Sequence, residues 1–350
     1  MAEESTDVHR SNNFDTLRIL AAFSVMISHS FTVEGNPAEP LFTATDGQLS
    51  IGDLAVLIFF AISGFLIAKS YDRSHSAFDF VLARCLRILP ALIAVLFISA
   101  FVIAPFLTTL PVSEYFSNKH IYGYVIGNAL MWFHPSLPGV FENLPYPSAV
   151  NGSLWTLRPE IECYLAVLFL GLTKQLRGWL TFVLALAFAA LAFQKTVSRV
   201  GLYDMFGCFA AGATIYLWHV TPDWRAAIAC GCVFVAAIPM KHLAGVAGFT
   251  LSYVVIFLAL SPAIRLPQLA ARGDISYGLY VWAFFIQQLV ATTLIPNGRW
   301  WINLLISAPI AIAVAYMSWL AIEKPSLSLK VRLRHLKSVV PSTPKDLGIS

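Results

Sequence analysis

The stretch that decides the fold of this chain runs from Phe14 to Val33 and reads FDTLRILAAFSVMISHSFTV. It is long enough to cross a bilayer as a helix, yet it contains an arginine, Arg18, and a histidine, His29. His29 comes eleven positions after Arg18, which is almost three helical turns. Their side chains therefore share one face and lie about 16 Å apart along the helix axis. Ionisable groups at such a depth are costly, and we interpret them as functional.

Apolar segments recur along the rest of the chain. Of its 350 residues, 58% are hydrophobic and 12% are charged, a composition that excludes an ordinary soluble domain. Apolar segments lie at residues 14–33, 52–70, 88–108, 121–133, 155–172, 179–194, 201–218, 226–240, 244–261, 275–295 and 300–322. The fourth is short for a membrane span, so we expect it to be re-entrant or interfacial. The predicted fold class is all-α, a polytopic membrane helix bundle of about ten transmembrane helices.

The distribution of positive charge predicts the orientation of this bundle. With ten spans both termini lie on one side of the membrane, and seventeen of the 23 lysines and arginines fall on that side. The exceptions are Lys119, Arg158, Lys195, Arg199, Lys241 and Arg299. Because cytoplasmic loops are rich in lysine and arginine, we expect both termini in the cytoplasm. Arg18 then lies near the cytoplasmic surface and His29 lies towards the outside.

The expected domain organisation is simple. Residues 1–13 form a polar N-terminal tail, residues 14–325 the membrane domain, and residues 326–350 a basic cytoplasmic C-terminal tail. The first apolar segment lacks the features of a cleaved signal peptide, so we expect a retained helix. The five cysteines form no CxxC pair of the kind that binds metal, and no metal site is expected.

A basic cluster begins at the end of the second apolar segment and comprises Lys69, Arg84 and Arg87. The two arginines are three residues apart, so they are neighbours on a helix surface, on the same side of the membrane as Arg18. Guanidinium groups suit a phosphate-bearing ligand, because each can donate two parallel hydrogen bonds to phosphate oxygens. The alternative is ordinary anchoring of positive charge at the membrane surface.

A polar stripe occurs at the start of the fifth segment. Thr156, Glu160 and Tyr164 are spaced by four and share one helix face. A carboxylate at this depth can stay ionised beside a cation or be desolvated until it holds a proton. Glu160 is therefore a candidate acid or base, or a group that orients His29. The alternative is a carboxylate favoured at a helix start by the helix dipole.

Three other features are expected to be structural. Arg158 and Glu162, four residues apart, predict an ion pair on another face of the same helix. Asp274 precedes an apolar segment and is expected to cap its helix. Pro90 indicates a first-turn position or a kink, because proline removes a backbone hydrogen bond from a helix interior.

The motifs occur in a characteristic order. They are Arg18-x10-His29, Ser63-Gly-Phe-Leu-Ile67, Arg84-x2-Arg87-Ile-x-Pro90, Leu154-Trp-Thr-Leu-x2-Glu160-x3-Tyr164, Ile275-Ser-Tyr-Gly-x-Tyr280 and Glu323-Lys-Pro325. This series resembles acyltransferase family 3, integral membrane O-acyltransferases, over residues 14–325. The resemblance implies an enzyme that takes an acyl group, usually acetyl, from acyl-CoA in the cytoplasm. The acceptor would be a hydroxyl of an extracytoplasmic or lipid-linked glycan such as exopolysaccharide.

The resemblance also implies roles for individual residues. His29 would be catalytic with Arg18 as its obligatory partner, and the segment of Arg84 and Arg87 would belong to the acyl-CoA side. To these we add Glu160 as catalytic and Lys69 as donor-binding. Possible acceptor-binding or supporting residues are Tyr164, Trp155, Tyr277 and Tyr280.

No tightly bound cofactor is expected, since acetyl-CoA or another acyl-CoA serves as donor substrate. The expected partners are the glycan acceptor, membrane lipid and polysaccharide-biosynthesis proteins, with no nucleic acid. The expected location is the inner (plasma) membrane of a bacterium. The alternative function is a transporter or flippase of a lipid-linked saccharide, although no matched halves with broken helices are evident.

Overall fold

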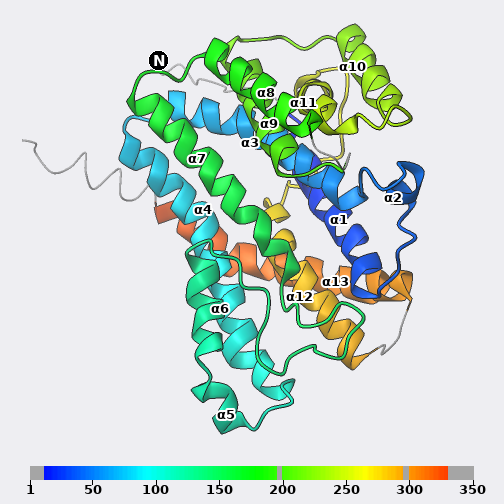
Figure 1. The fold of residues 1–350 in the computed structure, drawn as a ribbon. Coiled ribbons are helices and arrows are strands. Elements are labelled where there is room, and N and C mark those ends of the chain that lie inside the picture. Colours follow the sequence, from blue (N-terminus) through cyan, green and yellow to red (C-terminus); the bar gives the residue numbers. More distant parts are fainter. Residues whose placement is uncertain (1–11, 195–198, 295–298, 330–350) are drawn as a thin grey trace, which may run out of the picture.

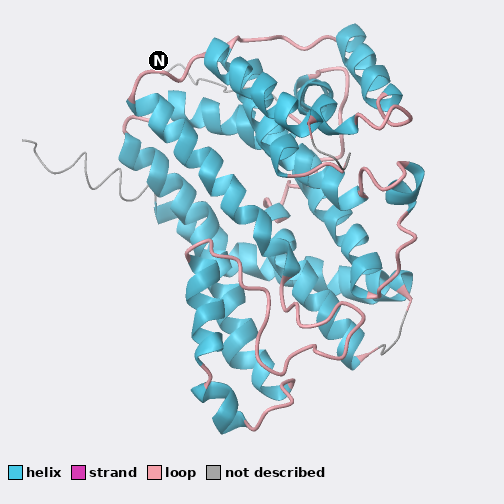
Figure 2. Ribbon diagram, viewed as in Figure 1, coloured by secondary structure: helices cyan, strands magenta, loops and turns pink. Residues whose placement is uncertain are grey.

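The structure, a computed structural model, describes residues 12–194, 199–294 and 299–329. Within these ranges the chain is helical and contains no strand (Figure 2). The helices form one bundle, from which α5 and α6 project (Figure 1). The longer helices are α1 (Phe14–Val33), α3 (Ile51–Asp72), α4 (Ala77–Phe97), α7 (Leu157–Leu172), α8 (Gly178–Phe193), α9 (Leu202–Leu217), α10 (Trp224–Ala236), α11 (Leu243–Leu260), α12 (Ser276–Thr293) and α13 (Trp300–Ser318). The shorter ones are α2 (Pro40–Ala44), η1 (Ile98–Ile103), η2 (Ala104–Phe106), α5 (Val112–Ser117), α6 (Lys119–Ala129), η3 (Gly152–Thr156) and η4 (Trp319–Glu323).

The backbones of α3 and α9 approach closely. A Cβ atom at Gly64 would lie 1.9 Å from the carbonyl oxygen of Phe209, and one at Gly212 would lie 2.2 Å from that of Ala61. Only glycine permits this approach, and small residues are typical of helix contacts in membranes. On its other sides α3 packs against α1 and α11, and α12 packs against α1 and α13. Helices α3 and α12 thus flank α1.

The third predicted segment begins earlier than the sequence indicated. We expected its start at residue 88, but α4 begins at Ala77, because the side chain of Ser76 accepts a hydrogen bond from the N–H of Asp79 at 3.1 Å. Both arginines of the basic cluster therefore lie well inside a helix. Pro90 lies in the interior of α4 rather than in its first turn. The helical path continues through the π-helix η1 and the 3-10 turn η2.

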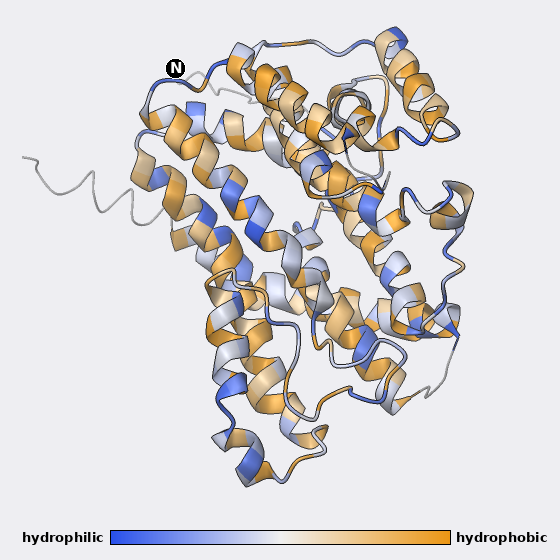
Figure 3. Cartoon of the chain, viewed as in Figure 1, coloured by the Kyte–Doolittle hydropathy of each residue, from blue (hydrophilic) through white to orange (hydrophobic). Residues whose placement is uncertain are grey.

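Several helices are suited to a membrane. Those long and apolar enough to cross one are Phe14–Val33, Ile51–Asp72, Ala77–Phe106, Leu243–Leu260 and Trp300–Leu329. Helices α8, α9 and α10 are apolar but shorter. Figure 3 shows hydrophobic residues along the helices and hydrophilic residues gathered in many of the connections. The chain is a helical, multi-pass membrane bundle.

Other parts of the topology stay predictions. The fourth segment forms α6, whose 11 residues are too few to span a bilayer, in agreement with a re-entrant or interfacial role. The count of ten spans and the cytoplasmic location of the termini are untested. Most of the two predicted tails, residues 1–11 and 330–350, lies outside the described residues.

Candidate active site

An ion cluster joins α1, α4 and the connection before α12. Atom Nη1 of Arg18 lies 2.9 Å from Oδ2 of Asp274, and Nη2 of Arg87 lies 2.5 Å from the same oxygen. The second carboxylate oxygen, Oδ1, accepts hydrogen bonds from the backbone N–H of Ser276 at 3.1 Å and from its hydroxyl at 2.5 Å. Asp274 thus holds both arginines and the first turn of α12 in one arrangement.

The role expected for Asp274 was incomplete. The N-cap predicted at Asp274 was wrong by one residue: the N-cap of α12 is Ile275, and Asp274 accepts the N–H of Ser276 from the position before it. The two guanidinium groups were not anticipated. Burial alone would raise the pKa of the Asp274 carboxyl, yet Arg18, Arg87 and the bonds from Ser276 lower the pKa below its usual value. The carboxylate therefore stays ionised. Its expected position on the same membrane side as both arginines was the signal that could have revealed it.

Two residues of the polar stripe, Glu160 and Tyr164, lie on α7 next to Arg84, whereas Thr156 ends η3. The hydroxyl of Tyr164 donates a hydrogen bond to Oε1 of Glu160, as their spacing predicted. The guanidinium carbon of Arg84 lies 6.0 Å from the centroid of the Tyr164 ring, within reach of a cation–π contact. Nη2 of Arg84 donates to the hydroxyl of Ser70 at 3.4 Å. Its Nε is buried and has no hydrogen-bond partner among the described residues, so Arg84 retains an unused donor.

A small cavity of about 50 Å³ opens beside these groups. It is lined by Arg18, Val56, Phe59, Phe60, Ser63, Thr156, Leu157, Glu160, Ser276, Tyr277 and Tyr280. Glu160 therefore lies at the same level as Arg18. The turn of α7 that carries Glu160 packs at the arginine end of the bundle, and among the described residues no hydrogen bond joins Glu160 to His29, the residue that it was expected to orient.

His29 lies elsewhere on the same face of α1. The helix is unbroken from Phe14 to Val33, so the predicted shared face of Arg18 and His29 is confirmed. The imidazole centroid lies 5.0 Å from that of Phe284, edge to face at 84°. Within the described part of the chain the ring forms no hydrogen bond, and His29 is not part of the cavity lining. Both of its nitrogens are thus available to another group.

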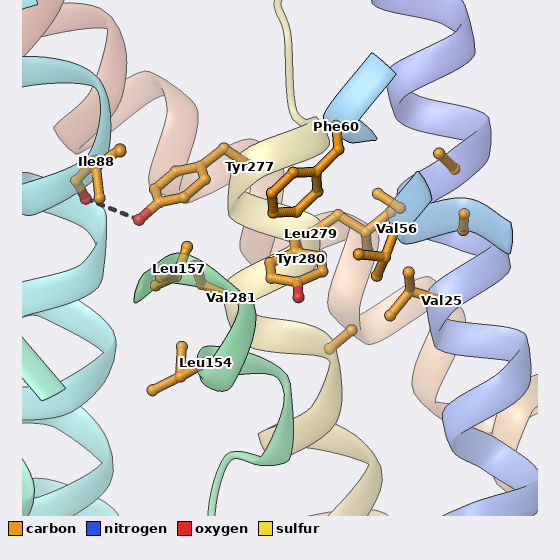
Figure 4. Close-up of a cluster of buried hydrophobic side chains, with 14 of the residues drawn as sticks. Val25, Val56, Phe60, Ile88, Leu154, Leu157, Tyr277, Leu279, Tyr280 and Val281 are labelled. Atoms are coloured by element: carbon orange, nitrogen blue, oxygen red, sulfur yellow. Dashed lines mark hydrogen bonds between the residues drawn. The ribbon is translucent and has the colours of Figure 1, made fainter. Parts of the chain in front are cut away.

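The other candidates divide into two groups. Tyr277 and Tyr280 line the cavity, and each hydroxyl is anchored on a backbone carbonyl: that of Tyr277 donates to Ile88 at 2.9 Å (Figure 4), and that of Tyr280 donates to Ser153 at 2.8 Å. Trp155 and Lys69 do not contribute to the cavity lining among the described residues. Trp155 is exposed, and Lys69 lies in the last turn of α3.

The remaining pair of charges on α7 is structural, as predicted. Nε of Arg158 lies 2.9 Å from Oε1 of Glu162, and both side chains are exposed. The described residues contain no group of three or more histidine, cysteine, aspartate or glutamate side chains placed to hold a metal ion.

Comparison with known proteins identifies the family. Residues 11–322 match the family model described as an acyltransferase domain. The chain belongs to acyltransferase family 3. It is 31% identical over 339 residues to an O-acetyl transferase of Shigella phage Sf6, covering 92% of this chain and 97% of the relative. It is 32% identical over 373 residues to nodulation protein 10 of Rhizobium leguminosarum bv. viciae, covering 95% and 97%. No solved structure matches the chain.

Membership of acyltransferase family 3 decides between the two functions that the sequence left open. The family and the relative named O-acetyl transferase identify the chain as an O-acyltransferase, and they give no support to a transporter. The match covers the helices that carry the ion cluster, the cavity and His29. The acyltransferase match thus includes the whole candidate site.

Proposed function

We propose that this O-acyltransferase moves an acyl group, most simply acetyl, from cytoplasmic acyl-CoA to a hydroxyl of a glycan outside the cytoplasm or linked to a lipid. An exopolysaccharide is one such acceptor. The observation that carries the proposal is one face of α1, with Arg18 in the ion cluster at one end and His29, which has no hydrogen-bond partner among the described residues, about 16 Å further along. Coenzyme A thioesters have phosphates at one end and the reactive carbonyl at the other, which suits this separation.

The donor phosphates would bind at the arginine end. Arg18 and Arg87 are already held by Asp274, so their positions are set before a ligand arrives. Arg84 has a buried Nε without a hydrogen-bond partner in the described chain, and a phosphate oxygen would accept a hydrogen bond from it. Lys69, at the end of α3, would add a further positive charge at the mouth.

Glu160 and Tyr164 form part of the same region. Their hydrogen bond joins them, and Arg84 lies over the Tyr164 ring. Three arginines, Arg18, Arg84 and Arg87, interact electrostatically with Glu160. Glu160 thus acts on the donor side of the proposed reaction, by placing Tyr164 and through it Arg84.

The acyl transfer itself would take place at His29. As a general base, His29 removes the proton of the acceptor hydroxyl while that oxygen attacks the thioester carbonyl. The carbon–sulfur bond then breaks, and the sulfur of coenzyme A receives the proton. As a nucleophile, His29 instead forms a bond to the acyl carbon as the carbon–sulfur bond breaks; the hydroxyl oxygen then takes the acyl group from the imidazole, and the hydroxyl proton ends on the sulfur of coenzyme A. Both routes end in an ester and coenzyme A thiol.

The proposed orientation follows the distribution of charge. With both termini cytoplasmic, the arginine end faces the cytoplasmic donor and His29 faces the acceptor. A bacterial inner membrane, with polysaccharide-biosynthesis proteins as neighbours, fits this arrangement. It also fits the bacterial or phage origin of the two relatives.

The test uses the purified full chain in liposomes with acetyl-CoA labelled in the acetyl group and a glycan fraction from the host envelope. We expect label in the glycan as an ester that mild base removes, and none with His29→Ala. Arg158→Gln, which changes an exposed ion pair, is the matched control and should transfer label normally. Transfer from a different donor class, with acetyl-CoA unused, would contradict the proposal.

A further inference from the structure

The cavity beside Arg18 stops short of His29. Between these two residues the same face of α1 carries Ala22 and Val25, and both side chains are buried. Val56 of α3 is buried as well and lines the cavity. An acyl group that enters with its phosphates at the arginines therefore meets packed side chains before it reaches the imidazole.

Tyr280 is the largest side chain at this barrier. Its ring extends from α12 to η3, where the hydroxyl donates to the carbonyl oxygen of Ser153 at 2.8 Å and shares a short hydrogen bond with the hydroxyl of Thr156. On the other side its ring packs edge to face with Phe59 of α3, with centroids 5.9 Å apart. Figure 4 shows the ring within the buried cluster that contains Val25 and Val56. Tyr280 is thus fixed on both sides.

The residue one turn further along α12 contacts His29. Phe284 shares a helix face with Tyr280, about 6 Å along the axis, and packs edge to face against the imidazole. A Cβ atom at Gly152 would lie 2.7 Å from the Phe284 ring, so η3 stays against α12 from Tyr280 to Phe284. In the described part of the chain η3 and α12 are thus in contact both at Tyr280 and at Phe284, and Tyr280 lies between the cavity that it lines and the residue that packs on His29.

We propose that Tyr280 is a specificity-determining residue that forms a constriction on the path from the cavity to His29 and excludes branched acyl groups. The inference rests on the proposed function, since it assumes that an acyl-CoA enters at the arginines. A constriction limits the width of what passes more than its length. Acetyl and straight-chain acyl groups are no wider than the arm of coenzyme A that follows them, whereas a branch next to the carbonyl is wider.

The test compares butyryl-CoA with isobutyryl-CoA, two isomers of the same size and polarity that differ in width. For each, kcat/KM is measured relative to acetyl-CoA with the purified full chain. Tyr280→Ala should raise the relative use of isobutyryl-CoA by about tenfold or more over wild type, the scale on which one carbon is discriminated in an apolar site. Relative use of butyryl-CoA should change less. Tyr280→Leu leaves a smaller cavity in the core and should also raise the relative use of isobutyryl-CoA. It replaces the alanine variant in the test if that variant does not fold.

Tyr124→Phe is the matched control. This variant also loses a buried tyrosine hydroxyl, which is hydrogen-bonded to Ser99 beyond the end of α4. It should leave the order of kcat/KM among the three acyl-CoA donors unchanged. An unchanged isobutyryl preference in the folded Tyr280 variants would overturn the constriction, as would equal use of both isomers by wild type. A wild-type protein that transfers nothing from acetyl-CoA would instead refute the proposed function.

Discussion

The ion cluster around Asp274 allows a quantitative test of how the site is held. Asp274→Asn keeps the size of the side chain but leaves two guanidinium groups without their carboxylate. Side-chain exposure is 14% for Asp274, 16% for Arg87 and 22% for Arg18, so the cluster is largely shielded from water. Removing one partner of a buried pair costs about 3–5 kcal/mol. Because the arginines remain partly exposed, we expect the lower end, about 3 kcal/mol.

The assay is thermal unfolding of the purified protein in detergent, followed by circular dichroism. Glu162→Gln is the matched control, because it makes the same chemical change in a pair whose side chains are 56% and 45% exposed. Exposed pairs contribute about 0–1 kcal/mol, so Asp274→Asn should unfold at a clearly lower temperature than Glu162→Gln. Acyl transfer should also fall in Asp274→Asn alone. Equal unfolding temperatures for the two variants would refute the argument that Asp274 holds the arginines in a buried cluster.

Four further outcomes are expected. Arg18 and Arg87 lower the pKa of Asp274 in the folded protein. The ionised Asp274 therefore contributes its full stabilisation above the pKa of the unfolded state, about 3.9, and this stabilisation is lost only as the pH falls through the pKa of the folded state. The stability gap between wild type and Asp274→Asn should therefore be equal at about pH 5 and about pH 8, and a gap that closes by pH 5 would contradict this. His29→Gln should bind acetyl-CoA normally in equilibrium dialysis yet transfer no acetyl, since an amide neither accepts a proton nor carries an acyl group; measurable turnover would remove His29 from the chemistry. Arg18→Lys should lose most activity, because a point charge does not replace a planar guanidinium, whereas a fully active variant would make Arg18 an anchor only. Arg84→Gln should raise the KM for acetyl-CoA about tenfold or more, the loss of one charge-assisted contact, and an unchanged KM would exclude Arg84 from the donor site.

Periodicity along the chain predicted the helices well where hydropathy and capping agree. The bounds expected for the first helix are those observed for α1, because its apolar run starts and stops abruptly. The start of α4 was predicted eleven residues too late, since Asp79, Arg84 and Arg87 lower the hydropathy of its first turns. There the cap at Ser76, a local hydrogen bond, sets the boundary.

The sequence by itself determined the helical membrane bundle and the shared face of Arg18 and His29, because both depend on the local spacing of residues along one helix. Only the tertiary structure decided which groups meet. Arg18 and Asp274 are 256 residues apart in the chain, and their ion pair depends on how α1, α4 and α12 pack. The same holds for Glu160 at the arginine end and for Tyr280 between α12 and η3. Helical periodicity specifies the face on which a side chain lies, whereas its partner across the bundle is set by the packing of whole helices.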